Sequence, residues 1–299
     1  MRILSLFFGI LGRTISYINR YFKTFVLLLL LLLFFWLFAP SSNESASFAN
    51  LERIDLRGEI FDATTVLEKI TKAKENSAIK GVLLLIDSPG GAFAPSMELA
   101  LAVKDLKAQK PVIVYAAGTM TSGSYLAGVG ADKIIANPAS FIGSIGVIVH
   151  GVDLSALAEK IGIKEQTLKA GAYKEAGTFA RAWSEEERAF LQDLIDQSYG
   201  LFSEFVAAER GLDINEKEKW ADARVFLAAE AQNLGLVDAL GNYEVAKKEL
   251  EGLAKVEFPV WKEADRIDKF LEKLDKQGVE FFSQILTRAL ASVNKTQIF

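Results

Sequence analysis

The residue best suited to covalent chemistry is Ser122, in the stretch "TMTSGSYLAG" (119–128). It stands between an apolar, strand-like run and a run of small residues typical of a helix start. A serine at such a junction could act as a nucleophile in acyl transfer, because the free N–H groups of a helix start favour developing negative charge. The simpler interpretation is a serine that only caps the helix. A nucleophilic Ser122 needs a neighbouring group that accepts its proton.

Two residues are candidates for that base, and the residues alone leave the choice open. The only histidine, His150, follows a predicted strand and would suggest a Ser-His-Asp triad, but it could equally be a surface or interface side chain. Lys174 lies in "LKAGAYKEAG" (168–177), where glycine and alanine leave space around an amine. Lysine acts as a base only when it is neutral, and burial favours the neutral form. The ordinary interpretation of Lys174 is a solvated charge.

The stretch "DSPGG" (87–91) is a candidate for stabilising an oxyanion. It follows the apolar run "GVLLLID" (81–87), and parallel-sheet proteins bind ligands at the carboxyl ends of their strands. Gly90 and Gly91 would let backbone N–H groups approach a bound group without hindrance from a side chain. The alternative is an ordinary tight turn.

A predicted alternation of strands and helices positions these three stretches. Buried strands are predicted at 81–87, 111–117, 133–137 and 145–149, and helices at 64–76, 95–110 and 184–211. The last helix begins with a capping-box pattern, Ser184 with Glu187, and ends before Gly211. The alternation predicts an α/β fold with a mainly parallel sheet and right-handed crossovers.

The N-terminal region predicts a membrane anchor. Residues 24–40 carry no charge, and every charged residue before Glu44 is basic. The positive-inside rule then places the N-terminus in the cytoplasm and the rest of the chain across the membrane. A cleaved signal peptide is the competing interpretation. The predicted organisation is a basic segment (1–23), an anchor (24–40), a linker (41–50), a folded domain (51–255) and a C-terminal helical extension (256–299).

Composition narrows the classes of function. The chain has 299 residues, of which 51% are hydrophobic, so it can bury a sizeable core. A net charge of −4 argues against a general nucleic-acid binder. The absence of cysteine excludes disulfides and thiol catalysis, and a single histidine argues against a His-rich metal site. We therefore expect neither a cofactor nor a metal.

Five motifs occur in order along the chain. They are "DSPGG" (87–91), "TSGSYLAG" (121–128), "GSIGVI" (143–148), "AGAYKEAG" (170–177) and "LGLVDALGN" (234–242). Together they resemble the signal peptide peptidase A family, a set of membrane-anchored Ser-Lys peptidases. The resemblance implies the fold of Clp proteases and crotonases, which is built from stacked ββα units. It also implies that Ser122 is the nucleophile and that Lys174, rather than Lys169, is the general base.

The same resemblance implies roles for the residues around the nucleophile. It assigns the oxyanion hole to Gly91, Gly90 and Gly123, and Ser144 is a candidate for orienting the amine of the base. The chain departs from the family pattern at Ser124, where a glycine is usual, and at Leu126, where a tyrosine is usual. Both departures flank the nucleophile, so they bear on substrate preference more than on catalysis.

The resemblance also implies partners and a location. In family members with one repeat, the serine and the lysine come from neighbouring subunits of a ring, so we expect a homo-oligomer with shared sites. The expected substrates are released signal peptides and other unfolded polypeptides near the membrane, and no nucleic acid. The expected location is the bacterial inner membrane, with the catalytic domain on the extracytoplasmic side.

Three other functions are compatible with these motifs. A crotonase-type hydratase or isomerase would use similar glycine-rich loops on coenzyme A thioesters, but needs neither a Ser-Lys pair nor an anchor. A sibling peptidase would cut one specific membrane protein. A non-catalytic membrane scaffold on the same fold would be supported by the loss of the serine or the lysine, and both are present.

Overall fold

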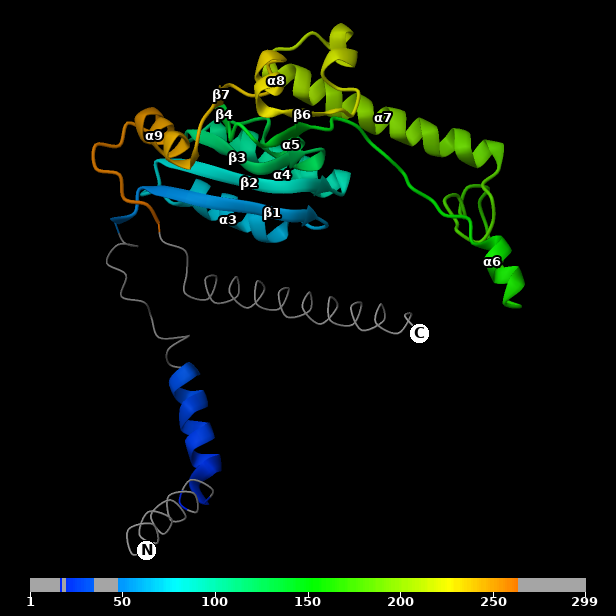
Figure 1. Ribbon diagram of the computed structural model, residues 1–299, viewed down its shortest axis with the longest axis horizontal. Coiled ribbons are helices and arrows are strands. Elements are labelled where there is room, and N and C mark those ends of the chain that lie inside the picture. The colour runs from blue at the N-terminus through cyan, green and yellow to red at the C-terminus, as the bar shows by residue number, and fades with distance from the viewer. Residues whose placement is uncertain (1–16, 18–19, 35–47, 263–299) are drawn as a thin grey trace, which may run out of the picture. The chain divides into compact units, whose positions relative to one another are not determined.

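The computed structural model describes residues 17, 20–34 and 48–262 (Figure 1). The chain divides into two units, one formed by Met1–Ser47 with Glu263–Phe299 and the other by Phe48–Lys262. Within the described part of the first unit, residues 20–34 are helical. No helix among the described residues is long and apolar enough to cross a membrane. Part of the predicted anchor, 35–40, lies outside the described residues, as does most of the predicted C-terminal extension.

The second unit is built on a mainly parallel sheet, as the sequence predicts. Its strands are β1 (Leu51–Ile60), β2 (Gly81–Gly91), β3 (Val112–Thr121), β4 (Lys133–Ala136), β5 (Phe141–Gly143), β6 (Val225–Leu227) and β7 (Ala239–Leu240). The order β1-β2-β3-β4-β7 is parallel throughout. The short strand β5 extends the pairing of β3 in parallel and pairs with β6 in the antiparallel sense. The carboxyl ends of β2, β3 and β5 therefore meet at one end of the sheet, where Ser122 and the candidate oxyanion glycines lie.

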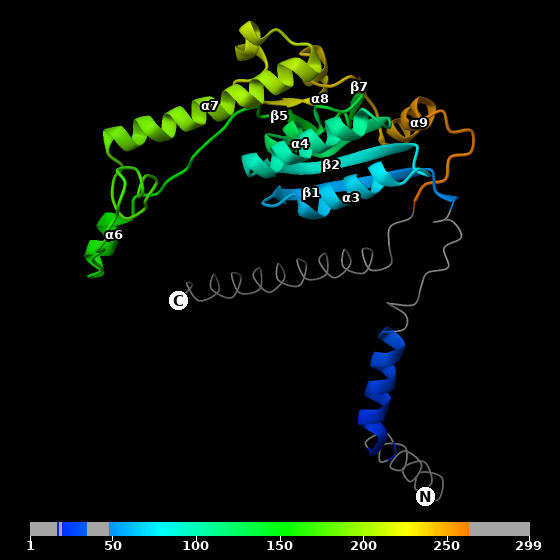
Figure 2. The same cartoon turned by 180° about the vertical axis from the view of Figure 1, so that it is seen from behind.

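Helices cover both faces of this sheet (Figure 2). They are α3 (Thr64–Glu75), α4 (Phe93–Lys107), α5 (Gly123–Gly128), α6 (Ser155–Lys160), α7 (Glu185–Arg210), the 3₁₀ helix η1 (Ile214–Lys219), α8 (Ala228–Asn233) and α9 (Tyr243–Leu253). The larger core packs one face of the sheet against α3, α4, α5, α7 and α8, and α9 covers the other face. The predicted capping box at Ser184 and the left-handed stop at Gly211 are confirmed for α7.

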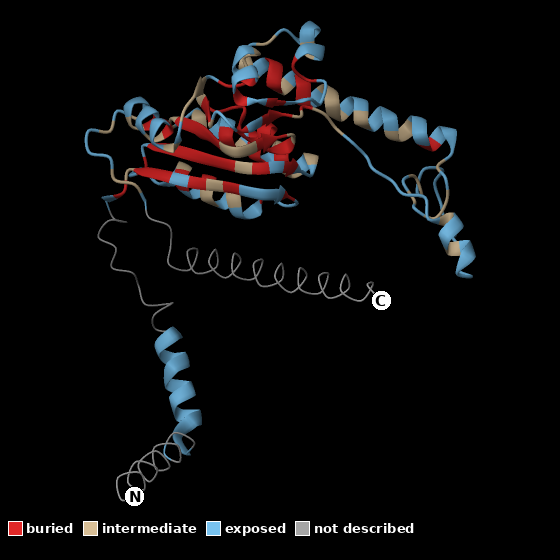
Figure 3. Cartoon of the chain, viewed as in Figure 1, coloured by how far each residue is buried: buried red, intermediate tan, exposed pale blue. Residues whose placement is uncertain are grey.

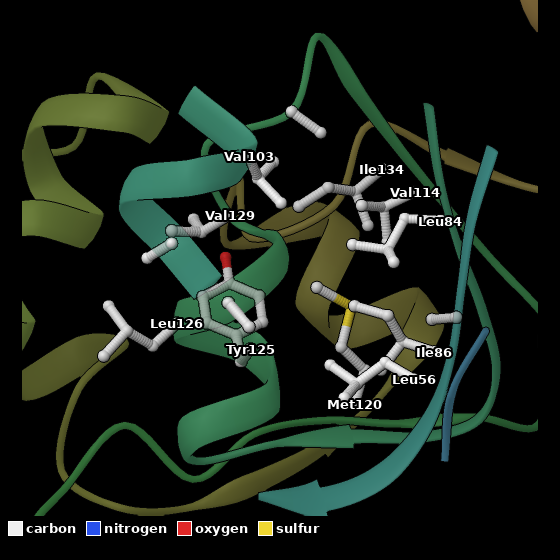
Figure 4. Close-up of a cluster of buried hydrophobic side chains, with 14 of the residues drawn as sticks. Leu56, Leu84, Ile86, Val103, Val114, Met120, Tyr125, Leu126, Val129 and Ile134 are labelled. Carbon is white, nitrogen blue, oxygen red and sulfur yellow. The ribbon is translucent and has the colours of Figure 1, made fainter. Parts of the chain in front are cut away.

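The short helix α5 sits at the centre of the larger core. Its side chains Tyr125 and Leu126 are fully buried and lie among Met120, Val129 and side chains of the sheet (Figure 4). The Tyr125 hydroxyl donates a hydrogen bond to the carbonyl of Leu236 at 2.8 Å, and burial raises the pKa of that hydroxyl. Because α5 cannot shift without opening the core, the residue at its start is held in a fixed place.

Three predicted elements differ from the structure. The strand predicted at 145–149 is absent, because left-handed backbone at Gly143 and Ser144 ends β5 and turns the chain away from the sheet. The predicted turn "SPGG" continues β2 as far as Gly91. Residues 256–262 are not helical and run beside the start of β1, where Lys262 N–H bonds the Leu51 carbonyl at 2.8 Å, so the folded unit extends beyond 255.

A long excursion between β5 and α7 projects from the rest of the unit. We call residues 148–184 the arm. None of its residues is buried (Figure 3). Large apolar side chains of the arm face solvent, including Ile148 at 79% exposure and Leu168 at 103%. In both cartoons the arm runs out from the sheet to the far end of α7, where α6 lies. The arm therefore has no core of its own within this chain.

Candidate active site

Ser122 occupies a strained turn between β3 and α5. Its backbone has φ of 53° and ψ of −128°, a conformation that costs a non-glycine residue about 1–3 kcal/mol. The turn is fixed from both sides, since Ser122 N–H donates to the Gly143 carbonyl at 2.7 Å and Leu126 N–H donates to the Ser122 carbonyl at 3.1 Å. The Ser122 side chain is half-buried and makes no hydrogen bond within the described residues. The hydroxyl is thus presented at the sheet edge and left free to react.

The buried hydroxyl of Ser124 stabilises the same turn by hydrogen bonds. It accepts a hydrogen bond from Thr121 N–H at 2.9 Å and shares its own proton between the Ser88 carbonyl at 2.7 Å and the Thr121 carbonyl at 2.9 Å. These contacts join the end of β2 to the end of β3. The departure from glycine at this position therefore has a structural role that the sequence pattern did not reveal.

Replacing Ser124 with alanine should destabilise the turn without removing the nucleophile. The change leaves Thr121 N–H and the Ser88 carbonyl buried without their partner, which costs about 1–3 kcal/mol of unfolding free energy. Denaturant unfolding measures this loss. Ser198→Ala is the matched control, because that hydroxyl only bonds back to its own helix at Leu194 and should change stability by less than about 0.5 kcal/mol. Equal stability of the two variants would contradict the assigned role of Ser124.

The glycines of "DSPGG" lie directly against the Ser122 turn. A Cβ placed on Gly90 would come within 2.6 Å of the Gly123 nitrogen and 2.9 Å of the Ser122 Cβ. Gly90 also has a φ of 95°, which favours glycine. Gly123 packs equally closely, since a Cβ there would overlap the hydroxyl of Ser96. Only glycine permits these two chain segments to approach so closely.

Gly91 and Gly123 present backbone amides to the same small space. The Gly123 N–H makes no hydrogen bond within the described residues, and a Cβ built on Gly123 would lie 3.3 Å from the Gly91 nitrogen. The bond that joins β1 to this end of β2 comes from Ala92 N–H to the Ile60 carbonyl at 2.8 Å. A Cβ on Gly91 would overlap the backbone of Ile60, so this glycine also allows β1 to pack. Two amides beside a serine hydroxyl can bind an oxyanion.

Ser144 follows the carbonyl that holds the Ser122 amide. It is half-buried, has a φ of 50°, and its N–H donates to the Arg224 carbonyl at 2.7 Å. The structure therefore brings Ser144 next to the nucleophile turn, although nothing in the sequence pattern indicated the Gly143 contact that links them. Its hydroxyl makes no hydrogen bond within the described part of the chain.

The two candidate bases lie elsewhere in the chain. Lys174 is exposed in the arm, on the loop before α7, and its amine has no hydrogen bond or ion pair among the described residues. His150 is also exposed, at the start of the arm and not at the end of a strand. Figure 1 shows the arm, which carries both residues, extending away from the sheet, whereas Ser122 lies between β3 and α5.

A network of ion pairs surrounds the Lys174 loop. Arg181 bonds both oxygens of Glu187 at 2.8 Å and Glu175 at 3.0 Å, and Lys169 bonds Glu175 at 2.8 Å. The Arg181 guanidinium, together with Ser184 N–H, holds the pKa of Glu187 at about 2. Hydrogen bonds from Lys169 and Arg181 lower the pKa of Glu175. Lys169, which the family resemblance excludes as the base, is thus paired with the carboxylate of Glu175.

The start of α7 should loosen in acid before the sheet does. A carboxylate with a lowered pKa stabilises the fold above its unfolded value of 4.5, and this contribution is lost as the pH falls towards about 2. Hydrogen exchange of residues 175–190 between pH 5 and about 2 measures the change. Glu187→Gln should reduce the pH dependence and leave the part that Glu175 contributes, whereas Glu185→Gln, at an exposed position of the same turn, should retain all of it. Unchanged protection of wild type across this range would contradict the role of the ion pairs.

Comparison with known proteins identifies similar sequences. The profile of peptidase family S49 matches residues 104–257. A candidate protease of Methanocaldococcus jannaschii is 39% identical over 198 residues, which are 66% of this chain and 64% of that protein. A candidate signal peptide peptidase SppA of Enterococcus faecium is 36% identical over 195 residues, 64% of this chain and 56% of that protein. The matched region thus spans less than two thirds of either relative.

Among solved structures, a mutant membrane-bound stomatin-specific protease is similar to this chain. Its TM-score is 0.45 and its sequence identity is 17%, with 67% of this chain and 84% of the other covered.

Proposed function

Because the chain belongs to peptidase family S49 and is a peptidase of the SppA type, we propose that it is a serine endopeptidase with Ser122 as the nucleophile. The observation that carries this proposal is the strained, half-buried Ser122 turn beside two amides that only glycine lets approach. Strain of this kind persists only where the surroundings enforce it, and it is concentrated at functional sites. The proposal includes the Clp protease and crotonase type of fold for residues 48–262.

In the proposed reaction, neutral Lys174 accepts the proton of the Ser122 hydroxyl as its oxygen attacks a peptide carbonyl. The N–H groups of Gly91 and Gly123 would hold the oxyanion that forms, with Gly90 keeping their approach open. The amine leaves with a proton from Lys174, and the acyl group stays on Ser122. Lys174 then activates a water molecule, which hydrolyses the ester and restores the serine. Ser144 would orient the Lys174 amine.

The proposal requires Lys174 to come from a second copy of the chain. Three features of the arm support this arrangement: none of its residues is buried, it displays apolar side chains to solvent, and its Lys174 amine has no partner among the described residues. Packing the arm against a neighbour in a ring would bury those side chains and desolvate the amine, which favours the neutral base. Each site would then combine Ser122 of one subunit with Lys174 of the next.

The proposed setting is a membrane. Residues 24–40 would anchor the chain, with the basic N-terminal segment in the cytoplasm and the peptidase unit on the extracytoplasmic side of a bacterial inner membrane. The run of apolar residues without charge and the basic residues before it support this part of the proposal. The substrates would be released signal peptides and other unfolded, apolar polypeptides at the membrane surface.

Hydrolysis of an apolar, signal-like peptide by the full-length protein in detergent tests the proposed function. We expect cleavage by the wild type that depends on Ser122 and is unaffected by a chelator, with the products identified by mass spectrometry. Cleavage that persists without Ser122 would contradict the assigned nucleophile. The absence of any cleavage, across peptides and unfolded proteins, would instead favour the non-catalytic scaffold.

A further inference from the structure

Both chain neighbours of Lys174 are fastened to the start of α7. The ring of Tyr173 stacks on that of Phe190 with 4.7 Å between centroids. On the C-terminal side of Lys174, Glu175 accepts a hydrogen bond from Arg181. Arg181 also donates to Glu187 in the first turn of α7. Because the loop has no buried residue of its own, these contacts hold the backbone on either side of Lys174 in place. Arg181 links the loop to the helix through charge, and Tyr173 links it through ring stacking.

The same contacts determine which charged groups lie near the Lys174 amine. The groups that face Glu175 are Lys169 and Arg181, and those that face Arg181 are Glu175 and Glu187. Two cations and two carboxylates therefore neutralise one another. The carboxylates are the less exposed members of this network, with Glu187 at 7% and Glu175 at 17% exposure, whereas the Arg181 and Lys169 side chains are 38% and 35% exposed and are reached by solvent. An unpaired Glu175 beside Lys174 would stabilise the ammonium form, which cannot accept a proton.

We propose that Arg181 is a positioning residue of the peptidase: it anchors the Lys174 loop to α7 and occupies Glu175, so that no carboxylate pairs with the Lys174 amine. This inference rests on the proposed function of Lys174 as the base. Arginine suits the role because its planar fork can bond two carboxylates at once, whereas lysine provides only a point charge. The capping box at Ser184 and Glu187 then serves a second purpose, since it fixes the carboxylate that Arg181 grips.

Competitive labelling with acetic anhydride tests the proposal without needing turnover. The full-length protein is labelled between pH 6 and 11, and the extent at Lys174 is measured by mass spectrometry, with Lys164 in the same arm as an internal reference. In Arg181→Gln, two carboxylates share the one cation Lys169, so we expect labelling of Lys174 at pH 8 to slow by about 10-fold. The double variant Arg181→Gln/Glu175→Gln should recover the wild-type rate, and Arg181→Lys should be intermediate.

A purely structural role for Arg181 gives a different pattern. If Arg181 only holds the loop against α7, Lys174 labelling should change equally in Arg181→Gln and in the double variant, or in neither. Either result would overturn the proposal. The pH profile of kcat/KM is the second readout. Its acidic limb, where activity rises as Lys174 loses its proton, should move to higher pH in Arg181→Gln and return in the double variant. If hydrolysis proves independent of Lys174 while labelling behaves as expected, the proposed base fails but the electrostatic effect of Arg181 stands.

Discussion

Replacing Ser122 with alanine should leave a folded protein that hydrolyses peptides at least about 10³-fold more slowly than the wild type. The change removes the Ser122 hydroxyl, while the amides of Gly91 and Gly123 remain in place. Residual hydrolysis would then come from binding and the oxyanion site alone. The loss should appear in kcat rather than in KM, because the hydroxyl reacts in the transition state and does little to bind the substrate.

The matched control for this change is Ser198→Ala, on the exposed side of α7. That variant should retain wild-type kcat, and circular dichroism should find both proteins folded. The Ser122→Ala protein should be as stable as the wild type, because the serine hydroxyl makes no hydrogen bond within the described residues and alanine leaves the backbone strain unchanged. Turnover within about 10-fold of the wild type in a folded Ser122→Ala protein would contradict the nucleophile assignment.

Lys174→Ala should reduce kcat by a comparable factor, about 10³-fold, since a serine hydroxyl without a base is a poor nucleophile. The exposed position of Lys174 means that its removal leaves no cavity, so thermal unfolding should be unchanged. Steady-state kinetics on an apolar peptide, with the oligomeric state followed by sizing, separates a catalytic loss from a loss of assembly.

Two further variants keep this prediction specific. Lys164→Ala removes another exposed lysine of the arm and should retain activity. His150→Ala should also remain active, because His150 lies at the start of the arm and outside any strand. Loss of activity in a well-folded His150→Ala protein, together with an active Lys174→Ala protein, would restore the Ser-His-Asp alternative.

The sequence predicts those parts of the fold that depend on local patterns. The strands at 81–87 and 111–117 are apolar throughout because both faces of a parallel sheet are covered, and the structure confirms them. The ends of α7 were predictable because Ser184, Glu187 and Gly211 bond or turn within a few residues. Ser122 was likewise recognisable as the residue that precedes a helix.

Other features depend on contacts that sequence patterns do not encode. The bond from Ser122 N–H to the Gly143 carbonyl joins residues that only the pairing of β3 with β5 brings together. The apolar run at 145–149 matched a buried strand, yet Ile148 is exposed, because a hydrophobic pattern does not say which molecule covers it. Glu175 and Arg181 lie in a loop without regular structure and Glu187 lies in α7, so no period of a helix or strand indicated that their side chains meet.

The claim that Ser122 and Lys174 form one site from two chains is tested most directly by mixing two inactive variants. Ser122→Ala protein retains Lys174, and Lys174→Ala protein retains Ser122. Subunits are exchanged by mild dissociation and reassembly, and peptide hydrolysis is then measured. With random assembly, about a quarter of the interfaces regain both residues, so the account predicts hydrolysis at about a quarter of the wild-type rate. Hydrolysis no greater than that of the separate variants, in verified mixed oligomers, would contradict it.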